Sequence, residues 1–213
     1  MNWLVKTFSS SIGKKLMMAV TGLCFIGFLM VHLAGNLTVT AGGEVFNAYA
    51  AKLHSLGAPL LVMEFVLLAL AVVHVITGLY LFYRNVMARP QRYAVNRNAG
   101  GRTLGSATMP YTGVVILAFL VIHLTNFTFV DKTGTTIFQI VSNAFQNPVT
   151  VLFYTLVMVV VALHVSHGLW SALQTIGANH PKYMPVVMAA SLIFAVVVGI
   201  GFGFLPIYFS LIA

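Results

Sequence analysis

Four histidines lie well inside strongly apolar stretches of the sequence, and they are the residues most able to do chemistry here: His32, His74, His123 and His164. An ionisable side chain is costly in hydrocarbon, so each needs a partner or a ligand. A single histidine in such a stretch more often forms a hydrogen bond between helices. Four histidines with matched spacing instead indicate that their imidazoles bind haem iron.

The spacing of the four histidines indicates an internal repeat. His123 follows His32 by 91 residues, and His164 follows His74 by 90 residues. The neighbouring sequence repeats as well, as His-Leu in the first pair and as His-x-x-x-Gly-Leu-aromatic in the second. We interpret this pattern as the duplication of a two-helix unit, and repeats in membrane proteins often place functional sites at the interface between copies.

Two glycines belong to this repeat. Gly78 and Gly168 each follow a histidine by four residues, which places them one helical turn along the same face. The missing Cβ would let a flat macrocycle approach the helix, although glycine also serves close packing of membrane helices. The repeated motif favours haem. The same motif aligns His164, rather than His167, with His74, so we interpret His167 as a residue behind the ligand or beside a haem propionate.

The histidines fall at two depths. His32 and His123 each lie 17 residues beyond the flank of their stretch, about 25 Å from one membrane edge. His74 and His164 each lie 10 residues before the flank of theirs, about 15 Å from the same edge. Two histidines at each depth predict two bis-imidazole haems, one above the other. A haem iron held by two imidazoles has no open coordination position, so its function is to transfer electrons.

The elements that must position these residues are membrane-spanning helices. The chain has 213 residues, of which 60% are hydrophobic and 7% are charged, too few charges to cover a water-facing surface. Five stretches approach or exceed the roughly 20 apolar residues that a span needs: 16–39, 59–83, 110–130, 148–175 and 184–210. The sequence therefore predicts an all-α membrane protein, one domain over residues 1–213, with four helices in a haem-binding bundle and a fifth added. The first stretch exceeds the apolar core of a signal peptide, so we expect it to be retained.

Basic residues predict the orientation. Nine of them fall on one side of the predicted spans: Lys6, Lys14, Lys15, Arg84, Arg89, Arg92, Arg97, Arg102 and Lys182. Only Lys52 and Lys132 fall on the other, which predicts a cytoplasmic N-terminus and an outer C-terminus. The net charge of +8 thus reflects topology and does not indicate nucleic-acid binding. A single cysteine, Cys24, excludes a disulfide framework, a protein-held iron–sulfur cluster and covalent haem attachment.

The chain resembles the five-helix, dihaem cytochrome b anchors of succinate dehydrogenases and fumarate reductases. The motifs that carry the resemblance are His32, Glu44-Val45-Phe46-Asn47, His74 with Gly78-Leu79-Tyr80, His123, and Leu163-His164-Val165-Ser166 followed by Gly168-Leu169-Trp170. The resemblance implies that His74 and His164 bind a proximal haem b near the cytoplasm, and that His32 and His123 bind a distal one.

The same resemblance implies the partners and the location. A flavoprotein subunit with FAD and an iron–sulfur subunit would dock on the cytoplasmic side of a bacterial inner membrane, and we expect part of segment 84–102 to contact these subunits. The anchor would exchange electrons with a quinone, typically menaquinone. Some fumarate reductases carry a glutamate two residues before the histidine that matches His164, whereas this chain has Ala162, so we do not carry that proton route over.

A quinone site needs groups that donate hydrogen bonds or protons. On the outer side these are Glu64, His54, Lys52 and Glu44. Glu64 is a carboxylate inside a predicted span, at about the level of the distal haem, although it could simply pair with Lys52. We expect Asp131 and Lys132 to cap the outer end of the third span.

Two other functions remain open on the sequence. The chain could be the cytochrome b of a hydrogenase or formate dehydrogenase, whose helix order and spacing differ. It could also be a repeat-built transporter with histidine relays. A transporter would be colourless, whereas a dihaem anchor would show low-spin b-type absorption bands.

Overall fold

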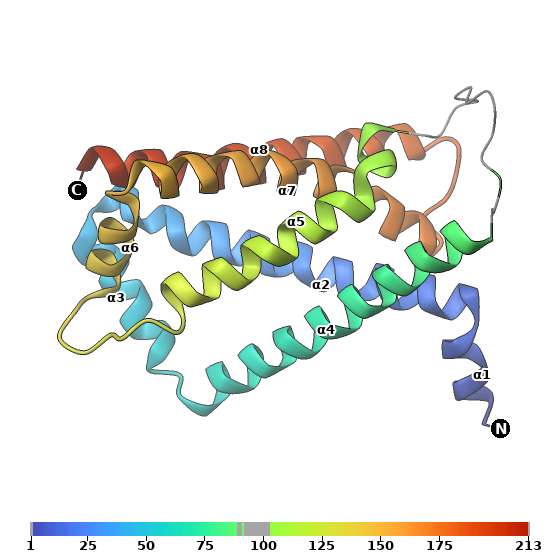
Figure 1. Ribbon diagram of the computed structural model, residues 1–213, viewed down its shortest axis with the longest axis horizontal. Helices are drawn as coiled ribbons and strands as arrows, with labels where there is room; N and C mark the ends of the chain where they lie inside the picture. The colour runs from blue at the N-terminus through green and yellow to red at the C-terminus, as the bar shows by residue number, and fades with distance from the viewer. Residues whose placement is uncertain (1, 89–90, 92–102, 213) are drawn as a thin grey trace.

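The computed structural model describes residues 2–88, 91 and 103–212, and every regular element within these ranges is helical (Figure 1). Five helices are long and apolar enough to cross a membrane. They are α2 (Ser11–Leu37), α4 (Ala58–Met87), α5 (Leu104–Phe127), α7 (Pro148–Thr175) and α8 (Met184–Ile212). The predicted all-α architecture with five candidate spans is confirmed.

The bounds of the third span differ from the expected 110–130. Helix α5 begins at Leu104, where the Thr103 hydroxyl accepts a hydrogen bond of 3.1 Å from the backbone N–H of Ser106. Pro110 therefore lies inside the helix instead of starting it. The N-cap decides the start, because a threonine side chain satisfies one of the first free N–H groups. The helix ends at Phe127, and the N–H groups of the next two residues bond back to its last turn.

Four short elements join or precede the spans and were not predicted: α1 (Trp3–Ser9), the 3-10 helix η1 (Thr38–Ala41), α3 (Gly43–His54) and α6 (Ile137–Phe145). Helix α6 begins at a capping box in which Thr136 and Gln139 satisfy each other's backbone N–H groups. The Asn47 side-chain oxygen accepts a 3.0 Å hydrogen bond from the N–H of Phe138, which ties α3 to α6. Figure 1 shows these two helices at the end with the C-terminus, and α1 and the α7–α8 connection at the other end.

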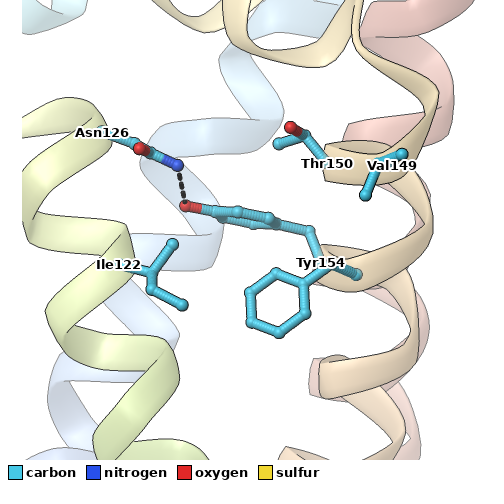
Figure 2. A pocket seen from close by; sticks show the side chains of 6 residues that line it. Ile122, Asn126, Val149, Thr150 and Tyr154 are labelled. Carbon is cyan, nitrogen blue, oxygen red and sulfur yellow. Dashed lines mark hydrogen bonds between the residues drawn. The ribbon is translucent and has the colours of Figure 1, made fainter.

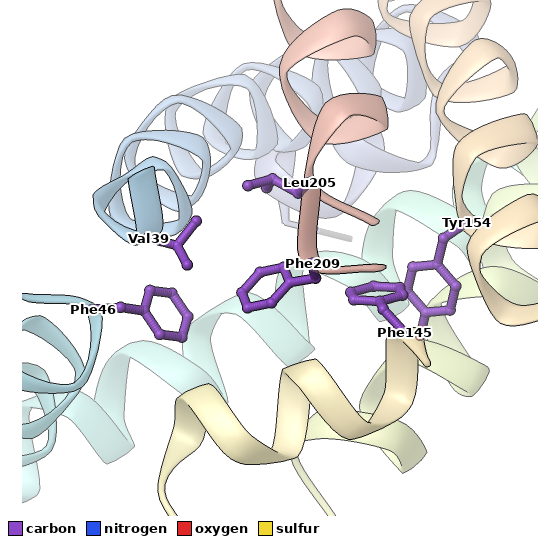
Figure 3. Close-up of a cluster of buried hydrophobic side chains, with 6 residues drawn as sticks. All are labelled: Val39, Phe46, Phe145, Tyr154, Leu205 and Phe209. Carbon is purple, nitrogen blue, oxygen red and sulfur yellow. The ribbon is translucent and has the colours of Figure 1, made fainter. Parts of the chain in front are cut away.

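A buried cluster closes the end that carries α3 and α6 (Figure 3). Its members come from five elements: Val39, Phe46, Phe145, Tyr154, Leu205 and Phe209. Phe209 is 1% exposed, and its ring lies about 6 Å from the rings of both Phe46 and Phe145. Burial of aromatic side chains contributes strongly to packing. The cluster therefore fixes this end of the bundle relative to α7 and α8.

The long helices differ in how tightly they pack. Helix α7 packs against α8, α5 and α2, whereas α4 lies mainly along α2 and meets α5 only slightly. A Cβ added to Gly199 of α8 would lie 2.9 Å from Cβ of Ala162, so α7 and α8 approach very closely there. Thr77 is the only buried residue of α4 within its described bounds. Most of α4 therefore faces away from protein.

Candidate cofactor site in the helix bundle

The structure brings His32 of α2 and His123 of α5 together. Their ring centroids lie 5.9 Å apart, and their planes are 87° apart. A metal–imidazole nitrogen bond is about 2 Å long, and that nitrogen lies about 1 Å from the ring centre. Two axial imidazoles on one iron would therefore have centroids about 6 Å apart. The observed separation fits this arrangement.

Aromatic rings surround this pair in a repeated way. The ring of Phe28 stacks on His32 at 5.0 Å, and that of Phe119 lies 5.6 Å from His123. Phe28 and Phe119 are themselves 91 residues apart. Nδ1 of His123 is buried and has no hydrogen-bond partner among the described residues. Buried polar atoms are usually satisfied, so an imidazole without a protein partner at Nδ1 is unusual for a histidine with a purely structural role.

The other two histidines have matching settings on neighbouring helices. Nδ1 of His74 on α4 lies 2.9 Å from Oγ1 of Thr21 on α2. Nδ1 of His164 on α7 lies 3.0 Å from Oγ1 of Thr112 on α5. Both threonines are buried, and they are 91 residues apart. The structure therefore repeats one threonine–histidine contact in both halves of the chain.

The hydrogen-bond geometry of each threonine favours one tautomer of its histidine. A hydroxyl has one proton. In Thr21 this proton is donated to the carbonyl oxygen of Met17 at 2.7 Å. In Thr112 it is donated to the carbonyl oxygens of Met109 and Thr108, at 3.0 and 3.1 Å. The hydroxyl must then accept from Nδ1–H, which leaves the lone pair on Nε2. That nitrogen is the one a metal would bind, and a fixed Nδ1–H is the usual arrangement behind a ligating histidine.

A second pair of repeated glycines, Gly22 and Gly113, lies beside these histidines. A Cβ added to Gly22 would lie 3.6 Å from Cε1 of His74, and the equivalent contact of Gly113 with His164 is 3.5 Å. The two backbones therefore come close to the edges of the rings. Gly78 and Gly168, which we expect to make room for a macrocycle, face the terminal methyl groups of Met18 and Met109, at 3.4 and 3.5 Å from an added Cβ.

His167 lies apart from the His74–His164 setting. Its ring makes an edge contact with Trp170 at 4.8 Å, and its Cβ lies 2.9 Å from a Cβ added to Gly105 at the start of α5. Nδ1 of His167 is buried without a partner in the described parts of the chain. His164, and not His167, has the hydroxyl contact that matches His74. This difference agrees with the alignment of His164 as the equivalent residue.

The proposed quinone-site residues lie at the opposite end from α1. Glu64 is exposed in the second turn of α4. Lys52 and His54 are exposed in the last turn of α3, where Nδ1 of His54 bonds to the carbonyl oxygen of Ala50 at 2.8 Å. No hydrogen bond or salt bridge joins the three within the described residues.

Two other sequence expectations concern connecting segments. Arg84 is exposed at the end of α4, whereas Arg89, Arg92, Arg97 and Arg102 lie outside the described residues. We expected Asp131 to cap the end of α5, but it does not. Its carboxylate accepts hydrogen bonds from the backbone N–H and hydroxyl of Thr133, at 2.9 and 2.7 Å, and these bonds lower the pKa of Asp131. Asp131 could not have capped the end of α5, because a carboxylate only accepts hydrogen bonds and cannot satisfy the carbonyl oxygens at a helix C-terminus.

The sequence analysis missed the threonine contacts, although a signal was present. Met18-x-x-Thr21-Gly22 recurs as Met109-x-x-Thr112-Gly113, with the same offset of 91 that relates His32 to His123. Extending the comparison of the first and third spans toward their starts would have found it. A comparison along the sequence cannot show that these residues touch histidines on other helices.

The residues present fit haem better than a free metal ion. In the parts of the chain that the structure describes, no group of three or more His, Cys, Asp or Glu residues could hold a metal ion. Haem iron needs at most two protein ligands, because its macrocycle supplies the others. Paired imidazoles with fixed tautomers and an aromatic surrounding suit such a group.

Comparison with known proteins points the same way. The chain is 25% identical over 155 residues to the succinate dehydrogenase cytochrome b558 subunit of Bacillus subtilis (strain 168), an alignment that covers 70% of this chain and 72% of the relative. It is similar to a cytochrome b subunit. No family model and no solved structure matches the chain. The similarity supports the family resemblance, and with five apolar helices it indicates a multi-pass membrane protein.

Proposed function

We propose that this chain is the membrane anchor and electron-transfer subunit of a succinate dehydrogenase or fumarate reductase complex. It carries electrons between a quinone, of the menaquinone type, and an iron–sulfur subunit. The observation that carries the proposal is the paired setting of the histidines, with His32 and His123 at 5.9 Å and two more held by matching threonines. The similarity to a succinate dehydrogenase cytochrome b subunit supports the type of complex.

Two b haems are proposed: His74 and His164 would hold the proximal one, and His32 and His123 would hold the distal one. Bound haem supplies a one-electron carrier with no open coordination position. The protein contributes orientation: Thr21 and Thr112 accept from Nδ1–H of His74 and His164, which leaves the lone pair of each Nε2 available to hold a haem. Gly78 and Gly168 leave room beside the proximal haem, where the flexible side chains of methionines can adjust.

The partners follow from the same proposal. FAD and iron–sulfur clusters belong to a flavoprotein and an iron–sulfur subunit that dock on the cytoplasmic face of a bacterial inner membrane. The anchor's N-terminus lies on that face and its C-terminus lies outside, as the nine basic residues on one side of the spans predict. Glu64, His54 and Lys52 are candidates for the quinone site near the distal haem.

Purification of the native complex without chaotropes tests the proposal. We expect a flavoprotein and an iron–sulfur protein to copurify with this chain, and the preparation to contain two b haems per anchor with low-spin absorption bands. A colourless chain without these partners would contradict the proposal and favour a transporter. Two haems with a hydrogenase or formate dehydrogenase subunit instead would assign the chain to the other class of cytochrome b.

A further inference from the structure

A small pocket opens between α5 and α7, about one turn from His123 (Figure 2). Its volume is about 160 Å³, and it is lined by Ile122, Asn126, Val149, Thr150, Phe153 and Tyr154. An apolar cavity of about 150 Å³ is known to hold a benzene ring. The pocket therefore has room for one six-membered ring, and the rest of a larger ligand would extend through its mouth.

Tyr154 gives the pocket a hydrogen-bond donor. Nδ2 of Asn126 donates to the phenol oxygen of Tyr154 at 3.1 Å, as Figure 2 shows. The phenol oxygen thus acts as an acceptor, and its own proton has no acceptor among the described residues. Tyr154 is only 4% exposed. A buried hydroxyl with an unused proton favours a ligand that presents an oxygen acceptor.

The pocket lies beside the distal pair of histidines. The ring of Tyr154 lies 6.2 Å from that of His123, and Phe153 and Phe119 complete the aromatic surrounding. Tyr154 is also the counterpart of Glu64 in the repeat, because both precede a paired histidine by 10 residues. A ligand in the pocket would therefore lie next to the distal haem.

Two of the residues that line the pocket are exposed. Val149 is 71% exposed and Ile122 is 39% exposed, on helices long and apolar enough to lie in hydrocarbon. A ligand that enters here must dissolve in the membrane. An acyl chain has no oxygen for the phenol proton, whereas a ring that carries a carbonyl satisfies both the shape and the donor.

We propose that this pocket binds the headgroup of a membrane quinone, with a quinone carbonyl oxygen accepting a hydrogen bond from the Tyr154 phenol. Asn126 positions the phenol through its hydrogen bond, and Phe153 and Ile122 contact the ring. This inference rests on the proposed function and specifies its quinone site. It assigns the site to α5 and α7 in place of Glu64, His54 and Lys52.

The first test uses the native complex with Tyr154→Phe, which keeps the ring and removes the hydroxyl. Loss of one hydrogen bond of about 0.5–1.5 kcal/mol corresponds to roughly a two- to tenfold rise in KM for a soluble menaquinol analogue. Haem content and the rate with a dye acceptor at the soluble subunits should be unchanged. Tyr208→Phe on α8 removes a similar hydroxyl outside the pocket and should leave KM as in the parent.

The second test identifies the site directly. A naphthoquinone carrying an azido group, added to the native complex and illuminated, should label peptides containing residues 122–126 and 149–154, and unlabelled quinone should compete. Labelling of residues 44–64, or a raised KM in Glu64→Gln with no change in Tyr154→Phe, would overturn the inference. Label that unlabelled quinone does not displace would indicate a lipid site and would also overturn it.

A further variant is needed in case Tyr154→Phe disturbs the structure around the distal haem. If Tyr154→Phe loses the distal haem, Thr150→Leu tests quinone binding instead. This change narrows the pocket and leaves the Asn126–Tyr154 hydrogen bond in place, so KM should rise. An unchanged KM in Thr150→Leu would then overturn the inference. Absence of haem and partners from the parent complex would instead contradict the proposed function itself.

Discussion

At the scale of single residues, the four paired histidines differ in what holds their rings. His74 and His164 are each bonded through Nδ1 to a buried threonine hydroxyl, whereas Nδ1 of His123 has no partner in the described chain. The rings of His74 and His164 are therefore held by hydrogen bonds, and those of His32 and His123 have mainly aromatic contacts. The two proposed haems should respond differently to changes around them.

The first prediction concerns the ligands. His74→Ala or His164→Ala should remove mainly the proximal haem, because each variant deletes one axial imidazole. His32→Ala or His123→Ala should remove mainly the distal haem for the same reason. Haem quantitation and the low-spin spectrum of the purified complex measure the losses.

His167→Ala is the matched control for the ligand variants. His167 is three residues from His164 but faces Trp170 and Gly105. Both haems should be retained in this variant. Full haem content in His164→Ala together with a loss in His167→Ala would contradict our assignment of His164.

The second prediction concerns the threonines. Thr21→Val or Thr112→Val removes the acceptor of an Nδ1–H group, which makes the imidazole a weaker donor to ferric iron. The midpoint potential of the proximal haem should therefore rise. A hydrogen bond worth about 1 kcal/mol corresponds to roughly a fivefold change in the ferrous-to-ferric ratio at a fixed applied potential. A potentiometric titration followed by visible absorption measures this ratio.

Serine is the conservative replacement in this test. Thr21→Ser and Thr112→Ser keep the hydroxyl and should restore the parent potential. Thr125→Val on α5 removes a hydroxyl that bonds only to the carbonyl oxygen of Ile122, so it should shift neither haem. Equal shifts in Thr112→Val and Thr125→Val would show that the hydroxyl contact has no role.

At the scale of helices, α7 and α8 form the tightest pair, and the four histidines are presented by α2, α4, α5 and α7. Core residues of both helices interlock in one cluster, and Gly199 lets the backbones approach. Helix α4 has little protein around it. Its position depends on α2, through contacts such as Thr21 with His74 and Gly78 with Met18.

The third prediction tests the α7–α8 contact. A Cβ at Gly199 would lie 2.9 Å from Cβ of Ala162, so Gly199→Ala forces the helices apart and should cost about 1–3 kcal/mol of stability. Gly203→Ala on the same helix is the control, because its Cβ would lie 3.7 Å from Met158, an ordinary contact. Thermal unfolding in detergent, followed by size-exclusion chromatography, should show a lower midpoint for Gly199→Ala only. Equal midpoints would contradict the close contact.

At the scale of the whole molecule, the two ends have different structures. One end carries α3, α6 and the aromatic cluster around Phe209, and the other carries α1 and the α7–α8 connection (Figure 1). The proposed proximal pair lies nearer the second end. Docking of an iron–sulfur partner there would bring its clusters close to the proximal haem, whereas the quinone pocket lies near the first end.

The fourth prediction tests the orientation. In a Cys24→Ala background, Lys132→Cys and Lys182→Cys place single exposed thiols on connections at opposite ends of the molecule. The basic residues predict that a membrane-impermeant maleimide labels Lys132→Cys in intact cells. Lys182→Cys should be labelled only in inverted vesicles stripped of peripheral proteins. The reverse pattern would place the N-terminus outside and would move the docking face to the other end.

The sequence by itself determined the class of the molecule and its periodic features. Long apolar runs predict helices wherever water is absent, because only internal hydrogen bonds can satisfy the backbone there. Spacing of 91 and 90 residues also relates His123 to His32 and His164 to His74. These features are local or periodic, so they can be found by counting along the chain.

Only the tertiary structure decided which side chains meet. The Thr21–His74 and Thr112–His164 contacts join residues 53 and 52 positions apart on different helices, and helix rotation determines whether such residues face each other. The pocket at Tyr154 depends in the same way on how α5 and α7 pack. The start of α5 at Leu104 was set by the Thr103 cap, a local interaction that the apolar pattern did not record. Hydropathy and spacing fix depth along a helix, whereas packing fixes the direction in which each side chain points.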